Sequence, residues 1–149
     1  MSLIEQIQTD LKESLKQGNT QARDALRLLL AQLKNAAIAQ GQEMNTLSDD
    51  AVVAVVRKEI KKRDDALLMY EQGGREELAA QEKSEKALYE QYAPALATEG
   101  DIKAAVEKVI AELGATAQFG QVMQAVMKEL QGNADGKVVN AVVRSVLDK

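Results

Sequence analysis

The sequence predicts an all-α protein, and three observations support that prediction. Of the 149 residues, 46% are hydrophobic but only 3% are aromatic, so the core must consist of small and aliphatic side chains, which suits packed helices better than a sheet. Apolar residues recur at spacings of three and four along most of the chain. The single proline, Pro94, separates two groups of such segments. We therefore expect an N-terminal four-helix region followed by a small three-helix tail domain.

Two helices are predicted before residue 41. The first runs from Ser2 to Gln17 and ends at the Gly18-Asn19 pair, and its apolar stripe comprises Ile4, Ile7, Leu11 and Leu15. The second runs from Thr20 to Gln40 and stops at Gly41, and its stripe comprises Leu26, Leu29, Leu30, Leu33 and Ala37. Residues 41–47 are expected to form a loop.

Two further helices complete the predicted N-terminal region. Ser48 is a suitable N-cap, and the acidic Asp49 and Asp50 follow it in the first turn, where the helix dipole favours negative charge. The stripe of this third helix comprises Val53, Val56, Ile60 and Leu67. Gly73-Gly74 breaks the pattern, and a polar helix over residues 75–92 follows with a weaker face formed by Leu78, Leu88, Tyr89 and Tyr92.

Pro94 predicts the boundary between the two regions, because it disfavours helical geometry at Ala93 and donates no backbone hydrogen bond. We assign residues 1–93 to the N-terminal domain and 95–149 to the tail. Three shorter helices are expected in the tail, over 99–113, 119–130 and 136–147. Their predicted core comprises Val106, Ile110, Leu113, Val122, Val126, Leu130, Val139, Val142, Val143 and Val146.

The segment Gly132–Asn140 predicts a sharp corner between the last two helices. Gly132 can adopt the left-handed conformation that ends a helix, and Asp135 can cap the helix that begins at Gly136. We expect the side chain of Asn140 to bond to nearby backbone. These four residues form a structural motif, so the corner specifies shape more clearly than activity.

The composition excludes most catalytic schemes. The chain has no His, Cys or Trp, and it therefore lacks a group that titrates near neutral pH, a thiolate nucleophile and a Cys/His zinc site. We expect no catalytic residue, no metal and no cofactor. There is no apolar run of about 18 residues and no basic-then-apolar N-terminus, so we expect no membrane association and a cytoplasmic location. The oligomeric state is left open.

The clearest candidate binding segment is Arg57–Arg63, which places five positive charges in seven residues. Helical geometry puts Arg57 and Arg63 beside the Ile60 stripe, and it puts the three lysines on the opposite side with Asp65. These charges either contact phosphates or form a solvated face that pairs with Asp64, Asp65 and nearby acids. The candidate RNA contacts are Arg57, Lys58, Lys61 and Lys62 in this segment and Lys128, Lys137 and Arg144 in the tail. At the tail corner, Asp135 would repel an anion.

The tail sequence resembles a known family. The run Phe119–Met127, followed by Leu130–Gly136 and Val139-Asn140, is similar to the tail of the GatB/YqeY family. The N-terminal opening, the Arg27 region, the basic helix at 57–63 and the Tyr92-Ala93-Pro94 junction look like the free-standing YqeY-like proteins. The resemblance covers essentially the whole chain and implies a helical domain followed by a three-helix tail.

The resemblance also implies a function. The same tail ends the B subunit of the tRNA-dependent amidotransferase, where it is implicated in holding the tRNA body, so a tRNA-associated accessory module that binds tRNA or a tRNA-handling enzyme is expected. The resemblance further implies carbon–nitrogen ligase activity with glutamine as the amido-N donor. The chain has no Cys to attack glutamine and no phosphate-binding loop of the Gly-x-x-x-x-Gly-Lys-Ser/Thr type, so we expect no such activity from the isolated chain. The alternatives are this ligase and a protein-interaction module without an RNA role.

Overall fold

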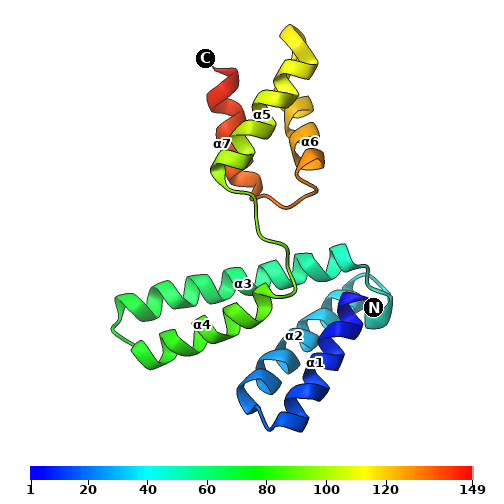
Figure 1. Ribbon diagram of the computed structural model, residues 1–149, viewed down its shortest axis with the longest axis vertical. Coiled ribbons are helices and arrows are strands. Elements are labelled where there is room, and N and C mark those ends of the chain that lie inside the picture. The colour runs from blue at the N-terminus through cyan, green and yellow to red at the C-terminus, as the bar shows by residue number, and fades with distance from the viewer. Residues whose placement is uncertain (149) are drawn as a thin grey trace. The chain divides into compact units, whose positions relative to one another are not determined.

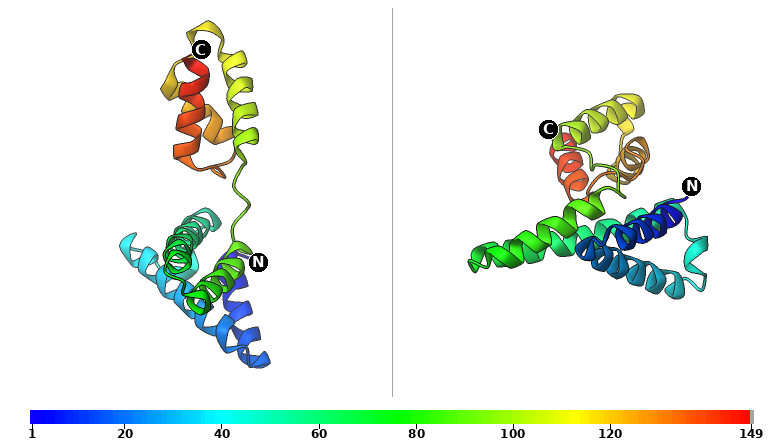
Figure 2. Two further views of the ribbon diagram at one scale, coloured as in Figure 1. Left: turned by 90° about the vertical axis from the view of Figure 1, so that its left-hand side faces the viewer. Right: turned by 60° about the horizontal axis from the view of Figure 1, so that its bottom comes forward.

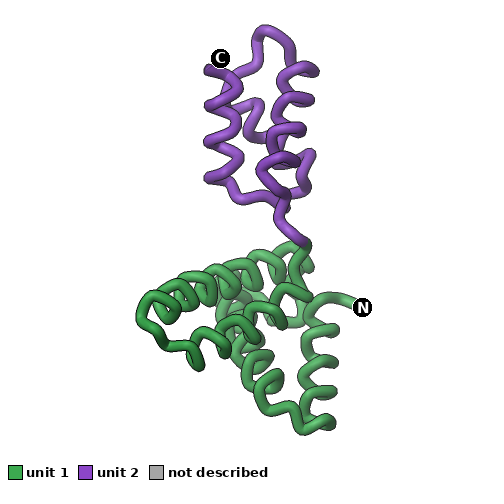
Figure 3. The backbone as a smooth tube through the Cα atoms, turned by 60° about the vertical axis from the view of Figure 1, so that its left-hand side comes forward, with its two compact units in different colours: residues 1–94 green, residues 95–149 purple. Residues whose placement is uncertain are grey.

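The computed structural model describes residues 1–148, which fold into seven α-helices without a β-strand (Figure 1). The helices are α1 Leu3–Gln17, α2 Thr20–Ala39, α3 Asp49–Gln72, α4 Glu76–Glu90, α5 Glu99–Leu113, α6 Phe119–Glu129 and α7 Gly136–Leu147. Short 3₁₀ turns occupy Met44–Thr46 and Gly114–Thr116. The all-α prediction and its four-plus-three arrangement of helices are confirmed. The chain divides into two compact units, unit 1 over Met1–Pro94 and unit 2 beginning at Ala95 (Figure 3).

Side-chain caps fix where several helices begin. The hydroxyl of Ser48 accepts a hydrogen bond from the N–H of Ala51, as expected of the N-cap of α3. Ser2 and Thr98 form capping boxes at the starts of α1 and α5. Each cap satisfies a backbone donor that would otherwise have no partner, and such caps contribute about 1 kcal/mol. The starts of these three helices therefore follow from local sequence.

Unit 1 consists of two antiparallel helical hairpins, α1 with α2 and α3 with α4 (Figures 1 and 2). Its buried core comprises Ile4, Ile7, Ala25, Leu26, Leu29, Leu33, Ala37, Leu47, Val52, Val56, Tyr89 and Tyr92. The expectation for Leu15 is wrong, because this side chain is 49% exposed. Ser14 is buried in its place, and its hydroxyl donates to the carbonyl of Leu11, which makes the burial of this polar group acceptable.

The inward face of α3 differs from the predicted stripe. Val52, Val56 and Glu59 are buried, whereas Val53, Ile60 and Leu67 are only half-buried. Apolar residues on two adjacent sides of α3 allow either side to face the core. The side that does so carries a glutamate. Glu59 forms ion pairs with Lys62 and Arg63, and these pairs compensate the cost of burying its charge.

Unit 2 is a bundle in which α5, α6 and α7 all pack on one another. Its buried core comprises Ile102, Ala105, Val106, Val109, Val122, Val126, Ala134, Val139 and Val143. Leu113, a predicted core residue, is 39% exposed because α5 ends there and the chain turns away at Gly114, whose φ is 73°. The burial of Ile102 and Val109 shows that the inward face of α5 begins one turn earlier than predicted.

The corner between α6 and α7 has the predicted caps. Gly132 adopts a φ of 74°, and its N–H donates to the carbonyl of Met127. Gln131 also has a positive φ, 54°, so two successive left-handed residues end the helix. The carboxylate of Asp135 accepts from the N–H of Lys137 at 2.9 Å. The expectation for Asn140 is wrong in its partner, because Oδ1 accepts from the side chain of Arg144 instead of from backbone.

Candidate nucleic-acid interface

Two open hollows on the described part of unit 1 lie apart from the candidate residues. One open hollow of about 260 Å³ lies between α2 and α4, and a second of about 340 Å³ lies between α3 and α4 near Gly74. Neither hollow is lined by any of the seven candidate RNA contacts. Six of these seven residues are exposed on helical surfaces, and Arg57 is half-buried.

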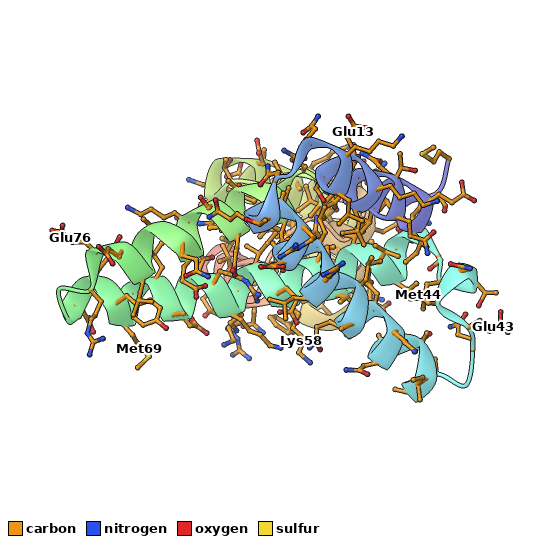
Figure 4. All side chains as sticks on the ribbon, turned by 90° about the horizontal axis from the view of Figure 1, so that it is seen from below. Glu13, Glu43, Met44, Lys58, Met69 and Glu76 are labelled. Atoms are coloured by element: carbon orange, nitrogen blue, oxygen red, sulfur yellow. The ribbon has the colours of Figure 1, made fainter. Side chains whose placement is uncertain are left out.

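The helical geometry of α3 separates the cations of the Arg57–Arg63 segment into two groups. Lys58, Lys61 and Lys62 are exposed, whereas Arg57 and Arg63 are half-buried (Figure 4, in which Lys58 is labelled). Because residues 52, 56, 59 and 63 follow one another at spacings of three and four, Arg63 lies on the buried face together with Glu59. Of the five cations in this segment, the three lysines are therefore the exposed ones.

Arg63 is held inside unit 1 by two carboxylates. Its Nη1 lies 2.7 Å from an oxygen of Glu59, and its Nε lies 3.1 Å from an oxygen of Glu85 on α4. The guanidinium also lies over the ring of Tyr89, 4.9 Å from the ring centroid. Burial opposes the charged form of Arg63, but its neighbours Tyr89, Glu85 and Glu59 raise the pKa overall. This arginine therefore links α3 to α4 and is not presented to a ligand.

Tyr89 extends this network to a third helix. Its hydroxyl donates to the carbonyl of Ala25 on α2 at 2.6 Å, and its side chain is fully buried. Burial raises the pKa of Tyr89 from 10.0 to about 12, although the nearby Arg63 acts in the opposite direction. The buried network of Glu59, Arg63, Glu85 and Tyr89 therefore connects α2, α3 and α4.

The raised pKa predicts alkaline destabilisation of unit 1. An unfolded chain loses the Tyr89 proton near pH 10 and the folded chain only near pH 12, so this contribution to stability is complete below pH 10 and is lost as the pH rises to 12. We expect the free energy of unfolding to fall over this interval, and to fall less steeply in Tyr89→Phe. Denaturant unfolding at stepped pH, followed together with phenolate absorbance, measures this effect. Ionisation of every tyrosine near pH 10 without loss of stability would contradict it.

Arg57 has an anchoring contact at the end of unit 1. Its Nη2 donates to the carbonyl of Pro94 at 3.2 Å, which ties α3 to the segment that follows α4. Tyr92 anchors the same segment, because its hydroxyl donates to a carboxylate oxygen of Asp10 at 2.5 Å. Burial and the Asp10 carboxylate raise the pKa of Tyr92. Arg57 therefore has a structural partner as well as a place in the basic segment.

The exposed lysines of α3 are not neutralised by the acids that follow them. Asp64 pairs with Lys86 of α4 at 2.6 Å, so this carboxylate is engaged across the hairpin. Lys62 lies 3.1 Å from Glu59, which it shares with Arg63. Within residues 1–148, neither Lys58 nor Lys61 forms an ion pair. Two of the three lysines therefore present uncompensated charge.

The tail candidates also differ in their surroundings. Lys128 and Lys137 are exposed and form no ion pair in the described part of the chain, whereas the adjacent Glu129 is paired with Lys108 at 2.6 Å. Asp135 accepts a hydrogen bond from the N–H of Lys137, so its carboxylate occupies the start of α7. A phosphate at this helix terminus would meet that negative charge. The lysine side chains are the more suitable anion contacts.

Arg144 is held by neutral groups. Its Nε donates to Oδ1 of Asn140 at 2.8 Å, and its guanidinium lies 4.9 Å from the ring centroid of Phe119, the first residue of α6. Phe119 is not among the site residues predicted from the sequence. The i, i+4 spacing of Asn140 and Arg144 could have indicated their contact, whereas the ring contact depends on how α6 packs on α7.

These observations define a small two-unit helical protein whose candidate site is a set of exposed cations. No helix within residues 1–148 combines the length and the apolar character needed to cross a membrane. The model of the Yqey-like protein family matches residues 4–147, and the chain belongs to that family. A search of curated proteins gives no match.

Proposed function

We propose that this protein is an accessory module that binds tRNA, or an RNA-bound tRNA-handling enzyme, and contributes no reacting group of its own. The observation that carries the proposal is the set of exposed lysines on α3 and in the tail that lack ion-pair partners. Family membership supports it, because the GatB/YqeY resemblance implies a tRNA-associated role. Among the described residues, the unpaired lysines of this set are Lys58 and Lys61 in unit 1 and Lys128 and Lys137 in unit 2. The exposed Lys62, which pairs with Glu59, and Arg144 complete the proposed contacts.

The distribution of charge is more favourable for this role than the net charge of −4 suggests. Two acids near the candidate lysines are paired with other cations, Asp64 with Lys86 and Glu129 with Lys108. An exposed lysine without a partner can neutralise an RNA phosphate, and the release of the cations condensed on that phosphate drives association. Arg63 is excluded from this role by Glu59 and Glu85, and Arg57 is secondary because it is bonded to Pro94.

A salt-dependent titration tests the proposal. The intact protein is expected to bind a tRNA transcript at low salt and to lose affinity as salt rises, because each phosphate contact releases counterions. In the double variant with Lys58→Gln and Lys61→Gln, the slope of log affinity against log salt should decrease by about 2, or about 1 for each lysine. Fluorescence anisotropy at four salt concentrations measures both quantities.

A matched control distinguishes the effect of losing a defined binding surface from the effect of lowering the overall positive charge. Lys12→Gln with Lys16→Gln removes the same charge from the exposed side of α1 and should leave the salt slope unchanged. An equal effect of the two double variants would contradict the proposed surface, and absence of tRNA binding at low salt would contradict the RNA role itself.

A protein-interaction role without RNA is the second candidate, and one observation favours it. Leu68 and Met69, near the end of α3, are 58% and 71% exposed (Figure 4 labels Met69). Exposed apolar side chains can contribute to a protein interface. The test is whether the immobilised protein retains a tRNA-handling enzyme after ribonuclease treatment. Retention by the wild type, and its loss in Leu68→Ser, would favour this role over direct RNA binding.

A further inference from the structure

We infer that Phe119, Asn140 and Arg144 form a prearranged binding site for the phosphodiester group of RNA, with the Arg144 guanidinium as the contacting group. This inference rests on the proposed function and names one specific contact within it. Arg144 comes from the last turn of α7, Asn140 lies one turn earlier, and Phe119 opens α6. The three residues therefore combine two helices of unit 2.

The two contacts of Arg144 fix its geometry. The hydrogen bond from Nε to Oδ1 of Asn140, 2.8 Å long, restricts rotation of the guanidinium in its plane. The Phe119 ring, with its centroid 4.9 Å from the guanidinium carbon, covers one face. An arginine that is held in this way loses less side-chain entropy when a ligand binds, since part of that loss occurs on folding.

The same contacts leave the positive charge of Arg144 uncompensated. Arg63 is surrounded by carboxylates, and Arg23 is paired with Asp24 at 2.9 Å. An amide oxygen and an aromatic ring carry no net charge, so they orient the guanidinium of Arg144 without neutralising it. Neither terminal nitrogen of Arg144 forms a hydrogen bond within residues 1–148, and the residue is exposed. Both nitrogens can therefore donate to a ligand.

A phosphodiester has the chemistry that this arrangement fits. Its two non-bridging oxygens can accept two parallel N–H bonds from the terminal nitrogens of an arginine. Lys137 lies seven residues before Arg144, which places it on the same face of α7 about two turns away. It can therefore contact a second phosphate of the same strand. Arg144→Lys would keep the positive charge but lose the paired N–H donors and the stacking on Phe119.

A structural role for Arg144 is the competing explanation, because a cation near a helix C-terminus is favourable and the aliphatic part of the side chain packs on Phe119. The two roles differ in what a charge-conserving substitution does. Arg144→Lys keeps the helix-terminal cation, so a structural role predicts unchanged tRNA affinity. Asn140→Ala removes no charge at all, so any loss of affinity in this variant reports the loss of orientation.

The experiment measures tRNA affinity of the full-length protein at one low salt concentration, with thermal unfolding as a check of integrity. We expect Arg144→Lys to weaken binding about ten-fold and Asn140→Ala about two- to ten-fold. Lys103→Gln, an exposed cation on α5, is the control and should change affinity less than two-fold despite its lost charge. Wild-type affinity in Arg144→Lys or in Asn140→Ala would overturn the inference while leaving the proposed function intact.

A second readout keeps the site testable if tRNA does not bind. The Nε–H signal of Arg144 in a nitrogen–proton spectrum should shift and saturate when inorganic phosphate is added, and the shift should be smaller in Asn140→Ala. A signal that does not respond to phosphate, in a protein that also fails to bind tRNA, overturns both the site and the proposed function.

Discussion

Arg63→Ala is expected to lower the free energy of unfolding of unit 1 by about 3–5 kcal/mol, as is typical when one partner of a buried ion pair is removed. The side chains of Glu59 and Glu85 are only 6% and 12% exposed, and the variant leaves both carboxylates without their shared cation. The variant also removes the guanidinium that lies over Tyr89. Urea unfolding followed by circular dichroism measures the loss.

Two control variants identify the cause of the stability loss in Arg63→Ala. Arg23→Ala removes an ion pair whose partner Asp24 is 62% exposed, and it should change stability by less than about 1 kcal/mol. Arg63→Met retains much of the apolar packing of the side chain but not its charge. If the buried carboxylates cause the loss, Arg63→Met stays strongly destabilised. Recovery of wild-type stability in Arg63→Met would show that packing, and not charge, is what Arg63 contributes.

Leu29→Ala is expected to destabilise unit 1 by about 3–5 kcal/mol while leaving the unfolding of unit 2 unchanged. Leu29 is fully buried in the core of unit 1, and truncation of such a leucine removes apolar contacts and leaves a cavity. Ile102 is 1% exposed in the separate core of unit 2, so Ile102→Ala should have the complementary effect. Backbone hydrogen exchange measured residue by residue reports the two units separately.

This pair of variants also tests the division of the chain at Pro94. Each unit has its own buried cluster, and we therefore propose that the two units unfold independently. Faster exchange across both units in Leu29→Ala would contradict that proposal and would indicate one cooperative structure.

The helices could be predicted from sequence because their signals are local. Caps such as Ser48 and Asp135, the glycines at 18 and 132, and apolar spacings of three and four all act within a few residues. The inward face of α3 could not be predicted in the same way. Val52 and Val53 offer competing registers, and the choice depends on a partner, Glu85, that lies 22 residues from Arg63.

The candidate site was predictable in part for the same reason. The sequence places Lys58, Lys61 and Lys62 on one side of a helix, and the structure shows all three exposed. The sequence alone does not indicate which cations are engaged by neighbouring helices. Arg63 is engaged by Glu85 of α4, and Arg144 is oriented by Phe119 of α6. Such contacts arise only when helices pack. Charge patterns alone therefore overestimate how available Arg63 is to a ligand and underestimate how well Arg144 is oriented for one.

Mapping of tRNA binding onto the isotope-labelled protein tests the central claim most directly. We expect substoichiometric tRNA to shift or broaden the backbone signals around Lys58–Lys62 and around Lys128, Lys137 and Arg144, while signals near Leu68 and Met69 stay unchanged. Changes confined to the exposed apolar end of α3, or no change at any tRNA concentration at low salt, would contradict it.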